Sequence, residues 1–177
     1  MSEKKISIGI IGTRGVPNGY GGFEQFASCF APWLVEQGYA VTVYCPHDNA
    51  FRETTWKGVQ LEFCYNPEDK LGTAGQFIYD LIANIRTRKK RHDIVLHLGY
   101  TSDSIWWPIW TGRSKHITNM DGMEWMRSKY SPRVQKFLRH AEKWAAVHSD
   151  LMIGDNEGIS ELLRKKYPKH KVKTIAY

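Results

Sequence analysis

The sequence predicts an α/β domain built on a mainly parallel, doubly wound sheet. Short apolar segments rich in β-branched residues alternate with segments whose apolar residues recur every three or four positions, as in alternating strands and helices. The chain has 177 residues, enough for one domain with a substantial core. A glycine-rich loop within residues 12–22 joins the first strand to the first helix, and ligands of such folds lie at these strand ends.

The first half of the chain supplies three strands and two helices. Segment 6–12 is apolar and predicts a buried strand, and the helix that contains Phe23 ends at Gly38. Pro32 is expected to kink this helix or to lie against a tightened turn. Further strands are expected at 40–45 and 59–63. A second helix, 75–90, should bury an apolar face made of Phe77, Ile78, Leu81, Ile82 and Ile85.

The second half continues the alternation. Ser131 and Pro132 supply an N-cap and a first-turn proline for a helix with a regular apolar repeat. Asp155 or Asn156 caps a further helix that ends before Pro168. Strands are expected at 94–98, 116–119, 151–154 and 171–176.

The composition is that of an ordinary globular protein, with 42% apolar and 24% charged residues. The sequence contains no apolar run long enough to span a bilayer and no signal-peptide pattern, so we expect a cytoplasmic protein, with the inner face of the membrane as an alternative site. Cys29, Cys45 and Cys64 lack the spacing of a zinc site or a disulfide framework. We therefore expect buried free thiols and no bound metal.

Basic residues give the chain a formal net charge of +7 and gather in segments 86–91 and 164–173. Such clusters suit nucleic acid, an anionic membrane, or helix ends, where cations complement the helix dipole. Because the clusters are split between two helix ends, we expect no nucleic-acid partner. Trp106, Trp107 and Trp110 are either core residues or part of a peripheral membrane contact.

The glycine loop does not match the common nucleotide-binding motifs. No window fits the Gly-x-Gly-x-x-Gly dinucleotide fingerprint, and no Gly-Lys-Ser/Thr of a phosphate-binding Walker loop occurs. Gly21 and Gly22 lie where the first-turn amides of a helix favour an anion, so the loop either contacts a phosphate or sugar or only forms a turn. A dinucleotide-binding domain of an oxidoreductase remains the alternative.

Three stretches together resemble the N-terminal domain of glycosyltransferase family 4, in its bacterial rhamnosyltransferase-type branch. They are GTRGVPNGYGGFEQF (12–26), NMDGMEWMRSKYS (119–131) and the less specific DLMIGDNEGISELLRKKYP (150–168). The resemblance implies one half of a GT-B fold, which has two Rossmann-like domains. It also implies a retaining, metal-independent hexosyltransferase without a cofactor, which moves a sugar such as rhamnose from a nucleotide-diphosphate sugar to a glycan or lipid-linked acceptor in polysaccharide biosynthesis.

The chain departs from this family in one respect. A complete member has a second domain, whose paired glutamates hold the donor, and that pair does not occur here. We therefore expect residues 1–177 to be the N-terminal, acceptor-side domain, with the C-terminal donor-binding domain absent from this chain. Such a fragment is expected to be inactive alone, and its own missing domain is its expected partner.

The resemblance also implies roles for individual residues. Asp121 matches a residue near the reacting sugar and is the expected catalytic group, although an Asp-Gly turn is the alternative. Gly21 and Gly22 are expected to face the donor diphosphate and sugar. His97 is expected to be satisfied inside the sheet. Tyr100, Thr101 and Asp103 either reach hydroxyl groups of a ligand or cap the next helix. The expected acceptor-binding residues are Arg14, Tyr20, Glu24, Tyr100, Asp103, Glu124, Trp125, Arg127 and Lys129.

Overall fold

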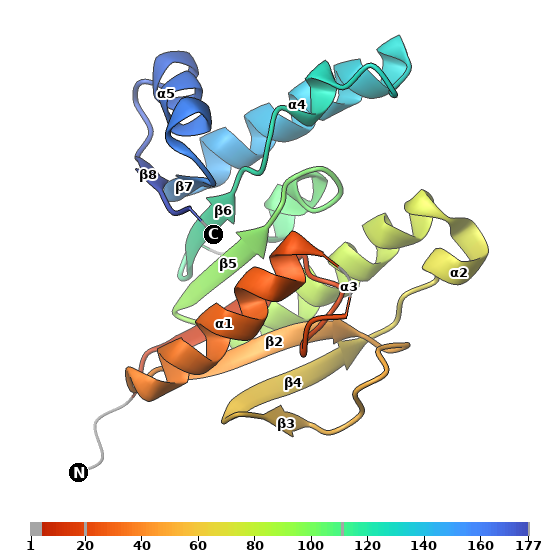
Figure 1. Ribbon diagram of the computed structural model, residues 1–177, viewed down its shortest axis with the longest axis vertical. Helices are drawn as coiled ribbons and strands as arrows, with labels where there is room; N and C mark the ends of the chain where they lie inside the picture. The colour runs from red at the N-terminus through yellow and green to blue at the C-terminus, as the bar shows by residue number, and fades with distance from the viewer. Residues whose placement is uncertain (1–4, 20, 111, 177) are drawn as a thin grey trace.

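Figure 1 shows a computed structural model of the chain, which describes residues 5–19, 21–110 and 112–176. Within these residues one sheet of eight strands has the order β3-β4-β2-β1-β5-β6-β7-β8. Neighbouring strands are parallel except β3 and β4, which are antiparallel. The strands are β1 (Ser7–Ile11), β2 (Ala40–Pro46), β3 (Thr55–Trp56), β4 (Val59–Cys64), β5 (Ile94–Leu98), β6 (Lys115–Asn119), β7 (Leu151–Gly154) and β8 (Val172–Thr174). This architecture confirms the predicted fold class.

The predicted helices are present, with three short additions. The α-helices are α1 (Gly22–Glu36), α2 (Glu68–Leu71), α3 (Thr73–Lys90), α4 (Pro132–His148) and α5 (Glu157–Lys166), and the 3-10 helices are η1 (Ser104–Ile109) and η2 (Glu124–Met126). The additions are α2, η1 and η2. α1 runs through Pro32 to Glu36. The Oγ of Ser131 accepts a hydrogen bond from the Val134 amide, and Asn156, not Asp155, caps α5 through the Ile159 amide at 2.9 Å.

Strand β1 shows how the two faces of the sheet are covered. Ile10 belongs to a cluster that includes Ala27 and Ala31 of α1, whereas the adjacent Ile11 packs with Ala83 of α3. Side chains alternate between the faces of a strand, so α1 and α3 cover opposite faces, as Figure 1 shows. A third cluster, beneath α4 and α5, comprises Tyr100, Met120, Ala141, Ala145, Ala146, Met152 and Leu163.

The structure corrects two expectations from the sequence. Ile85, placed on the apolar face of the second helix, is 37% exposed. The face of α3 that is buried consists of Gly75, Tyr79, Asp80, Ala83, Asn84 and Thr87, so polar residues occupy much of it. Cys29 is exposed on α1, whereas Cys45 and Cys64 are buried, and all three are free thiols.

The order of the strands predicts where a ligand binds. From β1 the chain moves to β2 on one side, and β5 then returns to pair with β1 on the other side. In a doubly wound sheet this change of direction opens a crevice at the carboxyl ends of the two strands. The sequence there supplies the glycine loop after β1 and residues 99–103 after β5.

Candidate functional site

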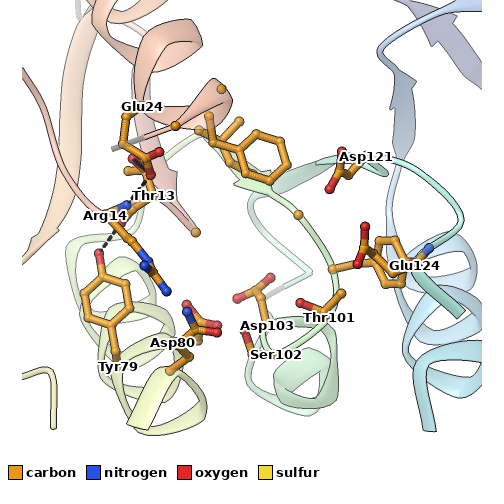
Figure 2. Close-up of a pocket in the computed structure, with 18 of the residues that line it drawn as sticks. Thr13, Arg14, Glu24, Tyr79, Asp80, Thr101, Ser102, Asp103, Asp121 and Glu124 are labelled. Carbon is orange, nitrogen blue, oxygen red and sulfur yellow. Dashed lines mark hydrogen bonds between the residues drawn. The ribbon is translucent and has the colours of Figure 1, made fainter. Parts of the chain in front are cut away.

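A cleft of about 420 Å³ lies at the carboxyl ends of β1 and β5. Figure 2 shows carboxyl groups around it from several elements, among them Glu24, Asp80 and Asp121. Its lining consists of residues 12–14, 21–24, 46, 66, 68, 76, 79, 80, 98–103, 121, 124, 127 and 130. The sheet therefore gathers residues that are far apart in sequence at the position expected for ligands.

The N-terminus of α1 forms one wall of the cleft. Gly21 is its N-cap and offers no side chain to the first-turn amides. A Cβ added at Gly22 would meet no atom within 4 Å, so its surroundings are open. Both glycines line the cleft, as expected for a loop that a phosphate or sugar oxygen approaches.

Glu24 ties this helix to the loop after β1. Its buried carboxylate accepts hydrogen bonds from the Thr13 hydroxyl at 3.1 Å and from the Arg14 amide at 2.6 Å. On the far side of the loop, the Tyr79 hydroxyl donates to the Thr13 carbonyl at 2.9 Å. The loop is thus held from two helices. Tyr20, the other predicted acceptor residue here, lies outside the described residues.

Arg14 reaches across the mouth of the cleft to α2. Its Nη2 lies 2.6 Å from Glu68 Oε1, which also accepts a hydrogen bond from Gln76. The guanidinium of this predicted acceptor residue is therefore paired in this structure.

The end of β5 brings Tyr100 and Asp103 to the cleft. The Tyr100 hydroxyl donates to the Gly122 carbonyl and accepts from the Glu124 amide, each at 3.2 Å, and so fixes the loop that follows β6. Asp103 lies 2.6 Å from both Asn84 Nδ2 and His97 Nδ1. His97 in turn contacts His116 at 2.9 Å inside the sheet, which confirms that it is satisfied there.

Asp121 lies on the side of the cleft formed by the loop after β6. Its backbone φ of +47° is a left-handed conformation that Asp and Asn tolerate better than most residues. Burial, and next the charge of Glu124, raise the pKa of its carboxyl above the usual value. The residue therefore has a left-handed backbone conformation and also lines the cleft.

The rest of this loop divides between the cleft and the adjacent helix. Glu124 lines the cleft and is paired with Arg127 at 3.0 Å. The Trp125 indole instead donates to Glu142 of α4 at 2.6 Å, and Lys129 lies over the ring of Tyr130. Neither Trp125 nor Lys129 belongs to the lining, whereas the other described residues of the predicted site do.

Sequence reasoning missed the contribution of the helices α2 and α3. Glu68, Gln76, Tyr79 and Asp80 all line the cleft. Burial, and next the charge of Asp103, raise the pKa of the Asp80 carboxyl well above its ordinary value. The signal that could have shown this face was the pair Asp80 and Asn84, two polar residues one helical turn apart within the otherwise apolar stretch 77–85.

The three tryptophans of η1 and its C-terminal end make contacts within the chain. Trp106 donates to the Phe77 carbonyl, Trp107 stacks on His148, and Trp110 stacks on His116. All three side chains are half-buried and belong to none of the three core clusters. Over the ranges that the structure describes, no helix has the length and apolarity to traverse a bilayer, and His, Cys, Asp and Glu side chains form no group suited to a metal.

A protein-family model described as "Domain of unknown function (DUF1972)" matches residues 5–177. A search of curated protein sequences gave no match. Among solved structures, sucrose-phosphate synthase from Thermosynechococcus elongatus is similar with a TM-score of 0.72 and 13% identity, over 97% of this chain and 48% of that one.

Two further structures show the same likeness. UGT2 of Phytolacca americana, complexed with UDP-2-fluoro-glucose and pterostilbene, has a TM-score of 0.62 and 9% identity over 100% of this chain and 55% of its own. A protein of Listeria monocytogenes described as a UDP-N-acetylglucosamine 2-epimerase has a TM-score of 0.54 and 17% identity, over 92% of this chain and 43% of that one. The chain thus spans about half the length of these structures, and at such identities the likeness establishes the Rossmann-like fold.

Proposed function

The chain belongs to the DUF1972 family, and we propose that it is the acceptor-binding half of a retaining, metal-independent glycosyltransferase with the GT-B architecture. The observation that carries this proposal is the cleft, in which the open N-terminus of α1 faces carboxyl groups contributed by other elements. The donor would be a nucleotide-diphosphate sugar, such as one of rhamnose, used as a substrate with no separate cofactor. The acceptor would be a glycan or a lipid-linked sugar.

The donor would approach this domain at Gly21 and Gly22. Amides at a helix N-terminus attract anionic oxygens, and the absence of a Cβ lets these oxygens approach the backbone. The open space around Gly22 supports this role. The remainder of the donor would be held by a second, C-terminal domain, which is the partner that the proposal requires.

Asp121 would orient the acceptor hydroxyl or take its proton as the glycosidic bond forms. A carboxyl whose pKa is raised by burial is better matched to a proton transfer near neutral pH than an exposed one. The other lining residues of the predicted set would hold the acceptor through hydrogen bonds; these are Arg14, Glu24, Tyr100, Asp103, Glu124 and Arg127. Trp125 and Lys129 would contribute only to a part of the acceptor that extends beyond the cleft.

The comparisons support the proposal at the level of the fold. UGT2 of Phytolacca americana is described in complex with both UDP-2-fluoro-glucose and pterostilbene. A dinucleotide is less well accommodated here, because β2 contributes Pro46 to the lining and Asp48, the first acid after that strand, is not part of it. A contact with an anionic membrane, if the acceptor is lipid-linked, would rest on the basic ends of α3 and α5.

The test is a transfer assay on a protein that joins this domain to its donor-binding domain. Candidate nucleotide-diphosphate sugars and acceptors are incubated with it, and products are identified by mass spectrometry. We expect transfer with retention of the anomeric configuration and no loss of activity in a metal chelator. Saturable binding of a nicotinamide dinucleotide, without transfer of any sugar, would contradict the proposal and favour the oxidoreductase alternative.

A further inference from the structure

The α3 side of the cleft carries a layer of buried polar groups. Asp80 is only 4% exposed and Asn84 only 2%, although both lie on a helix that packs against the sheet. Asn84 donates from Nδ2 to the Asp80 carbonyl at 2.8 Å and to the Asp103 carboxylate at 2.6 Å. Figure 2 shows Asp80, Ser102 and Asp103 close to one another on this side. Buried polar groups are costly unless they are satisfied, so such a layer requires an explanation.

Asp103 is held in a single orientation. One of its carboxylate oxygens accepts from Asn84, and the other lies 2.6 Å from His97 Nδ1. His97 Nε2 lies 2.9 Å from His116 Nδ1, so a consistent assignment has each imidazole donating from Nδ1 toward Asp103. A carboxylate has about four acceptor sites, and two are used here. Asp103 lines the cleft but is only 2% exposed, so a ligand would have to lie directly against it to use the others.

Asp80 provides the complementary group. It lines the cleft beside the negative charge of Asp103. Burial and that charge raise the pKa of its carboxyl, whereas a hydrogen bond with Ser102 lowers it. A protonated carboxyl has one O–H donor and retains acceptor capacity. The two residues therefore present a donor and an acceptor next to each other. A hydroxyl group, which both donates and accepts, matches either of them.

The positively charged side chains of the described lining are paired with glutamates, so they are not committed to neutralising an anionic ligand near Asp80 and Asp103. In the described lining, the guanidinium of Arg14 is paired with Glu68 and that of Arg127 with Glu124. A carboxylate or phosphate placed against α3 would face Asp103 without a cation committed to it. The chain has a net charge of +7, so the acidic character belongs to this cleft and not to the protein as a whole.

We propose that this side of the cleft selects an uncharged acceptor sugar that places neighbouring hydroxyl groups against α3: Asp80 and Asp103 hydrogen-bond these hydroxyls, and the charge of Asp103 disfavours an acidic sugar at that position. This inference rests on the proposed function, since it names the acceptor class of the same cleft. The two residues act by binding and positioning the acceptor, whereas Asp121 acts at the reacting hydroxyl.

The experiment measures binding of matched neutral and acidic glycosides to the isotope-labelled chain by NMR titration. The probes are the phenyl β-glycosides of glucose and galactose and the corresponding glucuronide and galacturonide, which differ only in carrying a carboxylate in place of the primary alcohol. We expect amide shifts in segment 99–103 and a dissociation constant for the acidic member that is at least about tenfold higher.

Two variants and a control variant show which carboxyl group causes the weaker binding of the acidic glycosides. Asp103→Asn removes the charge and should reduce the ratio of dissociation constants to within about threefold. Asp80→Asn should keep the ratio, because an amide is the neutral analogue of a protonated carboxyl. Asp69→Asn is the matched control, since Asp69 is exposed on α2 and outside the lining, and it should also keep the ratio. Thermal unfolding and the dispersion of the spectra check that each variant is folded.

The possible results distinguish a failure of the proposed selectivity from a failure of the proposed acceptor site. Equal or tighter binding of the acidic glycosides by the unaltered chain overturns the selectivity and leaves the acceptor site in place, and this result does not depend on any variant folding. An equal ratio in the folded Asp103→Asn and Asp69→Asn proteins overturns the role of Asp103. If no glycoside of the panel shifts the cleft amides, both the acceptor site and its selectivity are overturned.

Discussion

Asp121 has two properties that bear on the catalytic role proposed for it. Its φ of +47° requires a residue that tolerates the left-handed region, and its carboxyl lines the cleft. Asp121→Asn keeps both the shape and this tolerance, so the temperature of unfolding should stay nearly constant. Turnover of the two-domain enzyme should fall by about 100-fold or more, the range for loss of a general acid or base. Steady-state kinetics together with thermal unfolding measure the two effects.

The alternative for Asp121 is a residue that serves only the turn. If Asp121 serves only the turn, Asp121→Asn would leave turnover unchanged, and Asp121→Ala would lower stability without a specific effect on the reaction. Because donor contacts would lie mainly in the other domain, the dissociation constant for the donor should barely change in Asp121→Asn. A parallel loss of donor affinity would show that the residue acts elsewhere than proposed.

Asp80 is expected to reduce stability at neutral pH. Its pKa in the folded protein is raised, by burial first and by the charge of Asp103 second, whereas in the unfolded chain it is about 3.9. Between these two values the folded state binds more protons than the unfolded state, so the free energy of unfolding falls as pH rises. Asp80→Asn does not titrate. It should therefore raise the unfolding temperature by a few degrees at pH 7 and show little of this gain near pH 4.

The measurement is thermal unfolding of both proteins across this pH range. Asp69→Asn is again the control, because an exposed carboxyl should give almost no pH-dependent difference. A gain that stays constant with pH would mean that the proton of Asp80 is not involved. A loss of stability at pH 7 would show that Asp80 is ionised and satisfied in the folded protein.

Individual residues of the site were predicted unevenly from the sequence. Gly21, Gly22 and Asp121 stand in motifs next to strand ends, and the structure brings them to one cleft. Asp80 was missed although Asn84 lies one helical turn away, because only the folded chain brings this pair against Asp103, which follows β5. Trp125 was expected to face the acceptor, but its indole packs on α4 because Glu142 accepts its hydrogen bond.

At the scale of elements, the N-terminus of α1 can be tested by comparing two glycines of the same loop. Gly22 has open space around it, so Gly22→Val should change stability by no more than about 1 kcal/mol, the scale of helix propensity. The added side chain would occupy the region in which the donor is proposed to approach. Turnover of the two-domain enzyme should fall by about tenfold or more, with a higher KM for the donor.

Gly12 is the comparison for Gly22, because a side chain at Gly12 is expected to disturb the fold itself. Its φ is +79°, and an added Cβ would lie 2.4 Å from the Leu98 carbonyl oxygen. Gly12→Ala should therefore destabilise the fold by about 2 kcal/mol or more, as expected for strain of this kind. Thermal unfolding of the two variants separates the roles. If Gly22→Val were as destabilising as Gly12→Ala, the glycines at the start of α1 would serve only the turn.

Most of the helices and strands could be predicted from the sequence, because the spacing of apolar residues indicates their type and capping residues indicate where helices begin and end. Ser131 with Pro132 marked the start of α4, and Gly38 lies just beyond the end of α1. β3 was not predicted, since it is only two residues long and its turn is formed by Lys57 and Gly58, both with positive φ. The predicted buried face of α3 was wrong because β1, β4 and η1 pack against this helix and decide which side is covered, and a local pattern does not show these contacts.

For the whole molecule, the position of the cleft follows from the order of strands. β1 and β5 are neighbours in space but are separated in sequence by the β2, β4 and α3 segments, so no local pattern reveals that the glycine loop meets residues 99–103. What the sequence did supply was the alternation that predicts such a sheet, and with it the rule that ligands lie at carboxyl ends. The cleft at these strand ends is lined both by residues of the predicted site and by residues of α2 and α3 that were not predicted.

The last prediction concerns the division of function between domains. The chain spans about half the length of the solved structures that it resembles. If it is the acceptor-binding half, residues 1–177 alone should bind neutral glycosides yet transfer no sugar from a nucleotide diphosphate, because most of the contacts that orient the donor would be missing. Loss of that orientation is worth several orders of magnitude in rate.

The comparison is made between residues 1–177 and the two-domain enzyme, at equal concentration and with the same donor and acceptor. Asp121→Asn in the two-domain enzyme serves as the control for residual turnover. We expect transfer by residues 1–177 to lie below that of this variant, while binding of the acceptor by NMR is retained. Turnover by residues 1–177 close to that of the two-domain enzyme would mean that this cleft holds and activates the donor by itself, and the assignment of the acceptor side would then be wrong.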